Sequence, residues 1–190
     1  MGVHNEYFDQ SLTDRRTKRY AVVIFLPAHL DEVVKPIREK YDPLYNLVPL
    51  HISLAFPFDS AEPLDELAAK IKGVADSCKG PTIEMHSIGD FYPKFPVIYW
   101  DIKKNMELQT LHNSIYQSLN MSRPFQIYLP HATIAREISN HRVYMVKEAV
   151  VPYLPSERFE ASALDLITPL SGHKWVSVRT FSFGNSVIQP

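Results

Sequence analysis

Apolar residues occur along this chain with two kinds of spacing. The segment 19–27, RYAVVIFLP, is continuously apolar after its first residue and stops at a proline, which is typical of a buried strand. In 63–78, PLDELAAKIKGVADSC, apolar residues recur every three or four positions behind an opening proline, which predicts an amphipathic helix. The same criteria predict the remaining elements: strands in 51–58, in two parts of 82–103, in 131–136, 159–170 and 174–184, and helices in 28–41 (short or kinked at Pro36), 106–120 and 140–150.

The order of these elements predicts the class of fold. Read from the N-terminus it is β-α-β-α-β-β-α-β-α-β-β, and the elements around the strands at 51 and 131 roughly echo one another. We therefore expect a duplicated, bilobal α+β fold in which two antiparallel-type sheets face a central cleft. Because no proline- or glycine-rich linker interrupts it, the segment 19–190 should form a single domain behind a flexible lead-in of residues 1–18.

Two of the predicted strands carry the same short motif. HISL begins at His51 and HATI begins at His131. A hydroxyl residue follows two positions later in each, Ser53 in the first and Thr133 in the second. Because residues i and i+2 of a strand point to the same side, each strand should present an imidazole and a hydroxyl together above an apolar underside. A third match at His112 lies in a predicted helix, where this spacing makes the two groups diverge, so we set it aside.

A histidine followed by a hydroxyl residue is a weak signal when it occurs once. A single copy is more simply explained as a core or edge histidine beside a polar neighbour. Two copies, both inside apolar strands and both followed by another apolar residue, are much harder to ascribe to chance. The pair therefore favours one shared chemical site over two unrelated structural histidines.

Two imidazoles on opposite sides of a cleft can divide acid–base work near neutral pH, because the pKa of histidine is about 6.5. One imidazole takes a proton from an attacking oxygen while the other gives a proton to the leaving oxygen. The hydroxyls of Ser53 and Thr133 can donate hydrogen bonds to the non-bridging oxygens of a phosphate. This set of groups suits phosphoryl transfer from a phosphodiester without a metal, and it predicts a bell-shaped dependence of the rate on pH.

At these residues the sequence resembles the 2H phosphoesterase superfamily, which includes bacterial 2′-5′ RNA ligase-like proteins and RNA 2′,3′-cyclic phosphodiesterases. The family is defined by two His-x-(Thr/Ser)-x motifs in a bilobal fold. HISL and HATI fit that pattern, as do the PF after the first motif and the proline before the second. The element order fits as well, over residues 19–184. Two departures are Ser53, where threonine is more common, and Leu50, where many members have proline.

The resemblance implies a metal-independent enzyme without a cofactor, which acts on a 2′,3′-cyclic phosphate at an RNA end or on a small nucleotide, with 2′-5′ RNA ligation as a related reversible activity. It implies His51 as the proton donor and His131 as the proton acceptor. It also implies Ser53 and Thr133 as hydroxyls that contact phosphate. Arg136 corresponds to a basic residue that helps to hold phosphate in some relatives. By strict alternation Arg136 would face away from His131, so a surface ion pair stays open as the alternative.

Composition and charge limit the partners and the cellular compartment that we expect for the protein. The formal net charge is −1 over 190 residues, so the chain has no overall positive field, and any contact with nucleic acid should be local. The single cysteine, Cys78, cannot form an internal disulfide and is expected to be structural. With no secretory signal and no apolar run long enough to span a membrane, we expect a cytoplasmic monomer without membrane contact or an obligate protein partner.

Two other functions remain open at this point. A non-catalytic RNA- or nucleotide-binding module of the same fold could use the cleft without reacting. A metal hydrolase would need at least three converging ligands, and neither motif has a second histidine or an acid at ligand spacing. A base-stacking platform and further phosphate contacts could come from Tyr20, Phe56, Phe58, Tyr92, Trp100, Tyr128, Trp175, Lys94 and Lys103, although such aromatics are more often core and such lysines more often solvated.

Overall fold

The computed structural model describes residues 17–171 and 173–184. Nearly all of the lead-in predicted for residues 1–18 lies outside the described residues. The strands are β1 (Lys18–Phe25), β2 (His51–Ser60), β3 (Thr82–Asp90), β4 (Ile98–Ile102), β5 (His131–Ala135), β6 (Arg158–Glu160), β7 (Ala163–Pro169) and β8 (Trp175–Ser182). The α-helices are α1 (Ala28–Tyr41), α2 (Leu64–Ser77), α3 (Met106–Ser118) and α4 (Val143–Val150), with short 3₁₀ helices at Asn140–Arg142 and Val151–Tyr153.

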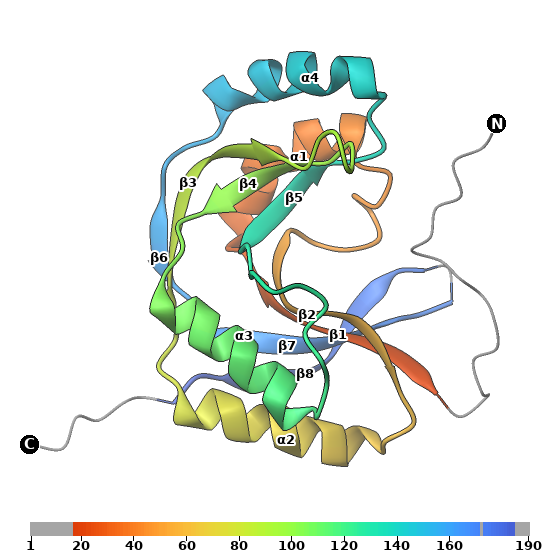
Figure 1. Cartoon of the computed structure of the whole chain (residues 1–190), viewed down its shortest axis with the longest axis vertical. Helices are drawn as coiled ribbons and strands as arrows, with labels where there is room; N and C mark the ends of the chain where they lie inside the picture. Colours follow the sequence, from red (N-terminus) through yellow and green to blue (C-terminus); the bar gives the residue numbers. More distant parts are fainter. Residues whose placement is uncertain (1–16, 172, 185–190) are drawn as a thin grey trace, which may run out of the picture.

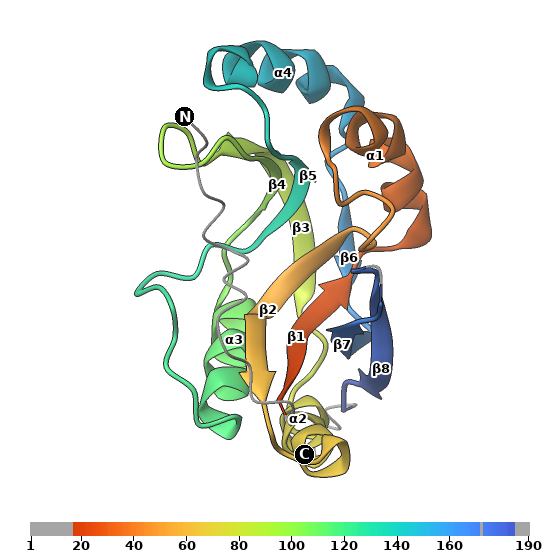
Figure 2. The same ribbon diagram turned by 90° about the vertical axis from the view of Figure 1, so that its right-hand side faces the viewer.

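The strands of the described residues join one antiparallel sheet in the order β6-β3-β4-β5-β2-β1-β7-β8. In Figures 1 and 2 this sheet curls into an open half-barrel. The strands that carry the two histidine motifs, β2 and β5, are neighbours at its centre and pair through Ile52 and Ala132. The α+β class is confirmed, but the expectation of two facing sheets is wrong. The two halves are continuous because the motif strand of each half pairs with that of the other.

Helices cover one face of the sheet and tie its halves together. α1 packs against β5 and α4 against β3, whereas α3 packs against β2, and α2 against β7 and β8. Figure 1 shows α4 at one end of the molecule and α2 with α3 at the other. α1 follows β1 but packs on the other half of the sheet, and α3 follows β4 and crosses in the opposite direction. This exchange buries both motif strands under helices from the opposite half.

The main hydrophobic core lies between the sheet and these helices. The apolar residues of the two motifs are completely buried there: Ile52, Leu54, Ala132 and Ile134. The alternation of a strand turns the histidines and hydroxyls of the same motifs to the opposite, open face, where they are partly exposed. The predicted arrangement of polar couples above an apolar underside is therefore confirmed. The described residues include no helix that is long and apolar enough to cross a membrane.

Two elements differ from the predicted ones. α1 is one helix of 14 residues with Pro36 inside it, so this proline does not shorten the helix that was expected to be short or kinked there. Pro36 and Glu32 are both exposed, so the Glu32 carbonyl that loses its helical donor can bond to water instead. The strand expected over 159–170 is split into β6, which pairs with β3, and β7, which pairs with β1. Apolar patterning does not show this change of partner, because pairing is set by distant strands.

Candidate active site

The pairing of β2 with β5 brings the two motifs together. Ile52 lies opposite Ala132 in antiparallel register, so His51 comes opposite Thr133 and Ser53 opposite His131. Directly opposed side chains on one face of a sheet have Cβ atoms about 4.5–5.5 Å apart. The four polar residues therefore lie side by side on one face of the sheet, and each histidine is opposite the hydroxyl residue of the other motif.

Each imidazole is oriented by the same backbone contact. His51 Nδ1 lies 2.7 Å from the Pro49 carbonyl oxygen, and His131 Nδ1 lies 2.8 Å from the Leu129 carbonyl oxygen. A carbonyl oxygen can only accept a hydrogen bond, so both Nδ1 atoms carry the proton. The Nε2 atom of each ring is thereby left to exchange a proton with a substrate. The contact recurs two residues before each histidine, in keeping with the duplicated order of the elements.

The surroundings make both imidazoles weak bases. Burial lowers the pKa of His51 to about 4, and the charges of Arg136, Arg38 and His131 act in the same direction, against the Pro49 carbonyl. Burial also lowers the pKa of His131, where the charge of Asp101 opposes the shift. Both rings are therefore neutral at pH 7 in the free chain. A phosphate anion between them would raise both pKa values, because it stabilises the protonated rings.

Aromatic side chains hold the His131 ring on the β4 side. The Phe91 ring meets it edge-on at 5.1 Å between centroids, and the Tyr99 ring lies at the same distance with a tilt of 58°. Tyr99 lies across Gly89 of β3, where an added Cβ would fall within 2.5 Å of the tyrosine ring atoms. Glycine at this position therefore admits the ring that supports His131. On the other side, Phe25 meets the His51 ring edge-on at 6.5 Å.

Arg136 forms an ion pair, but with a buried carboxylate rather than at the surface. β5 ends at Ala135, and the Arg136 amide donates to the Tyr41 carbonyl at 2.8 Å, which frees the side chain from strict alternation. Arg136 Nε lies 2.9 Å from Asp42 Oδ1, and the Asp42 side chain is completely buried. This is a close charge contact rather than an aligned hydrogen bond. Burial is the main cause that lowers the pKa of both motif histidines, and the charge of Arg136 acts in the same direction.

The other sequence candidates lie in ordinary structural roles. Among the aromatics considered for a stacking platform, Tyr20, Trp100 and Tyr128 are buried in the core. Lys103 pairs with Glu84, and Lys94 lies over the Phe95 ring. The partly exposed aromatics are Phe56, Phe58, Tyr92 and Trp175. Cys78 is half-buried just past α2.

Sequence reasoning missed several neighbours of the site. Asp101 and Tyr99 of β4 lie opposite His131 and Thr133, and Asp42 anchors Arg136. Alternation within 98–102 places Tyr99 and Asp101 on one face, but only the pairing of β4 with β5 shows which histidine they accompany. The described residues contain no group of three or more His, Cys, Asp or Glu side chains arranged to hold a metal ion.

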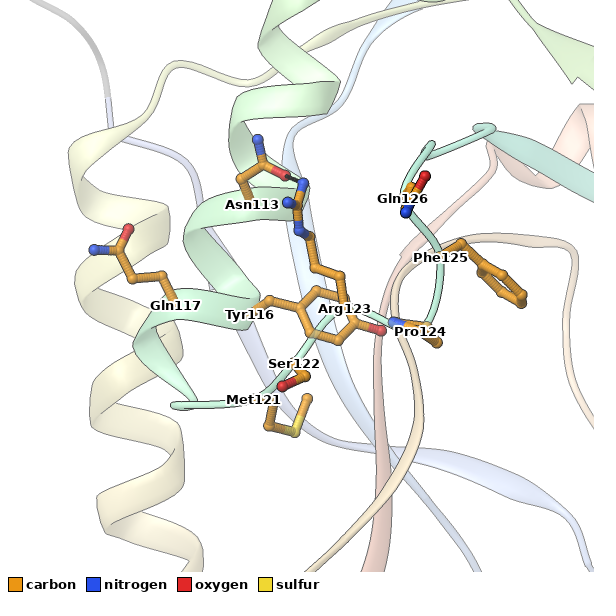
Figure 3. A pocket seen from close by; sticks show the side chains of 9 residues that line it. All are labelled: Asn113, Tyr116, Gln117, Met121, Ser122, Arg123, Pro124, Phe125 and Gln126. Carbon is orange, nitrogen blue, oxygen red and sulfur yellow. Dashed lines mark hydrogen bonds between the residues drawn. The ribbon is translucent and has the colours of Figure 1, made fainter.

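A pocket lies beside the site rather than at it. It has a volume of about 440 Å³ and lies between α3 and the loop that leads to β5. Figure 3 shows Arg123 reaching back to Asn113, and Tyr116 placed between the helix and the loop. Tyr116 Oη accepts a hydrogen bond from the Phe56 amide of β2, so one wall of the pocket touches a motif strand.

Comparison with known proteins shows the family of this chain. Residues 26–173 match the model of the 2′-5′ RNA ligase superfamily. A protein of Geobacillus kaustophilus named "Putative phosphoesterase" is 27% identical over 169 residues, which cover 87% of this chain and 96% of that protein. A protein of the same name from Bacillus licheniformis is 26% identical, with 87% and 99% covered.

The fold is also similar to solved structures. Crystal structures of Escherichia coli LigT with NADP⁺ and with 3′-AMP both superpose with a TM-score of 0.63, at 21% and 19% identity, and each comparison covers 89% of this chain and 99% of LigT. At this level of identity the likeness concerns the fold alone. The match of the family model spans most of the chain, so this chain belongs to the 2′-5′ RNA ligase superfamily, the 2H phosphoesterases.

Proposed function

We propose that this protein is a metal-independent phosphodiesterase that opens a 2′,3′-cyclic phosphate at an RNA end or on a nucleotide. The observation that carries the proposal is the shared face of His51 and His131, each with its Nδ1 bound to a carbonyl and its Nε2 free for a substrate. The names of the relatives support a phosphoesterase. LigT has been crystallised with 3′-AMP and with ATP, which supports a nucleotide as the ligand of this fold.

The proposed reaction is an in-line displacement at phosphorus. A water molecule attacks the phosphorus atom and gives its proton to His131 Nε2, while the bond from phosphorus to one ribose oxygen breaks. His51, protonated at Nε2, gives its proton to that leaving oxygen, which yields a phosphate monoester and a ribose hydroxyl. A 5′-hydroxyl of RNA in place of water would form a 2′-5′ linkage, and in the reverse direction the two histidines exchange roles.

The two sides of the site differ in a way that suits these roles. Asp101 lies opposite His131, and its negative charge stabilises the imidazolium that forms when this ring accepts a proton. His51 lies near the positive charges of Arg38 and Arg136, which make its protonated form the stronger acid. We therefore assign His51 as the proton donor and His131 as the proton acceptor.

Three further side chains are proposed to hold the phosphoryl group. The hydroxyls of Ser53 and Thr133 lie on the same face as the imidazoles and can donate to its non-bridging oxygens. Arg136 is bound to Asp42 through Nε, and its terminal nitrogens are the groups that we propose to donate to the phosphate. Hydrogen bonds and one guanidinium would thus neutralise the charge that develops on these oxygens.

The test is turnover of 2′,3′-cyclic AMP, and of an oligoribonucleotide with a 2′,3′-cyclic end, in the presence of EDTA. We expect turnover by the unaltered protein and a loss in kcat of about 10²–10⁴-fold in His51→Ala and in His131→Ala. His141→Ala, at an exposed histidine outside the site, is the matched control and should leave kcat unchanged. Binding without turnover would favour a nucleotide-binding module, and turnover abolished by EDTA would contradict the metal-independent reaction.

A further inference from the structure

β2 loses its partner strand directly after the first motif. After Ser53, which comes opposite His131, β2 faces the segment that precedes β5, where Pro130 has no amide proton to donate. On its other edge, Ser53 pairs with Val23 and Ala55 pairs with Val22, so Leu54 is an extra residue in β2. This irregularity is a β-bulge, and bulges beside active sites redirect the neighbouring side chains.

Side chains from α3 and the loop bond to the backbone of β2 in this region. Tyr128 Oη donates to the Ser53 carbonyl at 3.0 Å. The Leu54 carbonyl accepts from His112 Nδ1 at 2.8 Å. Tyr116 Oη accepts from the backbone amide of β2 two residues after the bulge, at 3.2 Å. Thus three side-chain contacts, at Ser53, Leu54 and Phe56, fix the backbone of β2 around and just beyond the motif.

These side chains form one buried cluster with fixed hydrogen-bond roles. The rings of His112 and Tyr128 stack with centroids 4.0 Å apart and 9° between their planes, and Tyr116 lies 4.9 Å from His112. His112 is 2% exposed and Tyr128 5%. Burial lowers the pKa of His112 and raises that of Tyr128, so the imidazole stays neutral and the phenol keeps its proton. Both groups can therefore donate to the strand throughout the pH range in which an imidazole pair would work.

Tyr116, which is 4% exposed, forms the outer side of this cluster. The pocket of about 440 Å³ in Figure 3 adjoins Tyr116 there. The rings of Tyr116 and Tyr128 pack in the core, whereas their hydroxyls and His112 Nδ1 bond to the backbone of β2. Removing one bond should then move the strand without emptying the core.

We propose that Tyr128 and His112 are positioning residues, which hold the bulge at Leu54 and thereby aim the Ser53 hydroxyl at the phosphoryl group. The inference rests on the proposed function and extends it to residues that touch no substrate. His112 was set aside in the sequence because its imidazole diverges from the hydroxyl that follows it in α3. The structure turns this imidazole toward β2 instead, where it bonds to the strand of the first motif.

The experiment is a double-mutant cycle of Tyr128→Phe and Ser53→Ala, with hydrolysis of 2′,3′-cyclic AMP as the readout. Tyr128→Phe keeps the stacked ring and loses one hydrogen bond, so we expect kcat about tenfold lower with KM changed by less than about twofold. In the Ser53→Ala background the same change should have almost no further effect on kcat. Tyr144→Phe, at an exposed tyrosine of α4, is the matched control.

If kcat of the double variant falls by the product of the two single losses, the positioning role is wrong. Such a result is expected from a general loss of stability, which does not depend on Ser53. A second pair of variants keeps the test independent of that hydroxyl. His112→Gln retains an N–H that can reach the Leu54 carbonyl and should keep most of the kcat that His112→Leu loses. Equal losses in the two would contradict the inference. The proposed function fails separately, if the unaltered protein turns over no cyclic phosphodiester.

Discussion

The two motifs share a pattern of residues, but their strands are held in place by different chemistry. On the first side, neutral donors from α3 and the following loop, His112 and Tyr128, bond to the backbone of β2. On the second side, the end of β5 is held by charge, because Arg136 lies against Asp42, which also binds Arg38 of α1. α1 precedes β2 as α3 precedes β5, so the two helices have equivalent places in the order of elements. One helps to hold a motif strand through charged side chains, and the other does so through neutral donors.

This difference shows how two similar motifs can have unlike surroundings. The pairs of histidine and hydroxyl are alike, and so are the carbonyl contacts that orient the imidazoles. Only His131 has a carboxylate directly opposite it, Asp101 of β4, among the cross-strand partners that the described strands give the two rings. The asymmetry therefore comes from neighbouring strands and helices, and the proposed roles of proton donor and proton acceptor rest on it.

The largest effect is expected on the charged side. Asp42→Ala leaves Arg38, which is 2% exposed, without its buried partner. Loss of one member of a buried ion pair lowers the free energy of unfolding by about 3–5 kcal/mol, and we expect the lower end because Asp31 also contacts Arg38. Urea denaturation measures the change.

Asp76→Ala, which removes an exposed ion pair with Lys72, is the control and should cost less than about 1 kcal/mol. An equal cost for the two aspartates would show that the charged side is not held by Asp42.

A smaller effect is expected in the pH dependence, and it sharpens the assignment of the two histidines. In the free chain the pKa of His51 is about 4, so its protonated fraction falls as the pH rises above that value, and kcat/KM should fall between pH 6 and 8. A bound phosphate anion raises the pKa of both rings, so the optimum of kcat should lie at higher pH than that of kcat/KM. Steady-state rates of 2′,3′-cyclic AMP hydrolysis across this range test the shift, and coincident optima would contradict it.

The sequence predicted the parts of the site that depend on local order. Alternation in a strand places His51 with Ser53 and His131 with Thr133, and apolar residues at the intervening positions anchor them. It did not predict that β2 and β5 are neighbours, because strand pairing depends on contacts between residues about 80 positions apart. The bulge at Leu54 and its partner His112 were missed for the same reason.

The sequence also did not predict the ion pairs that Asp42 forms. Asp42 stands just past α1 beside a proline, where an aspartate is usually a solvated helix end or turn residue. Its role follows only from the return of β5 to the end of α1, where the Arg136 amide bonds to the Tyr41 carbonyl. Strict alternation would turn Arg136 away from His131, and it does not apply here because β5 ends at Ala135.

The most direct test of the paired mechanism compares two leaving groups in the two histidine variants. In a nitrophenyl phosphodiester the leaving group is nitrophenolate, which is stable as an anion. It departs without a proton and does not need a general acid. With this substrate the loss of kcat in His51→Ala should be at least about tenfold smaller than with 2′,3′-cyclic AMP. The loss in His131→Ala should be the same with both substrates, because the attacking water still needs a base. Recovery by His131→Ala alone would reverse the assignment, and equal recovery by both would contradict the division of acid and base between them.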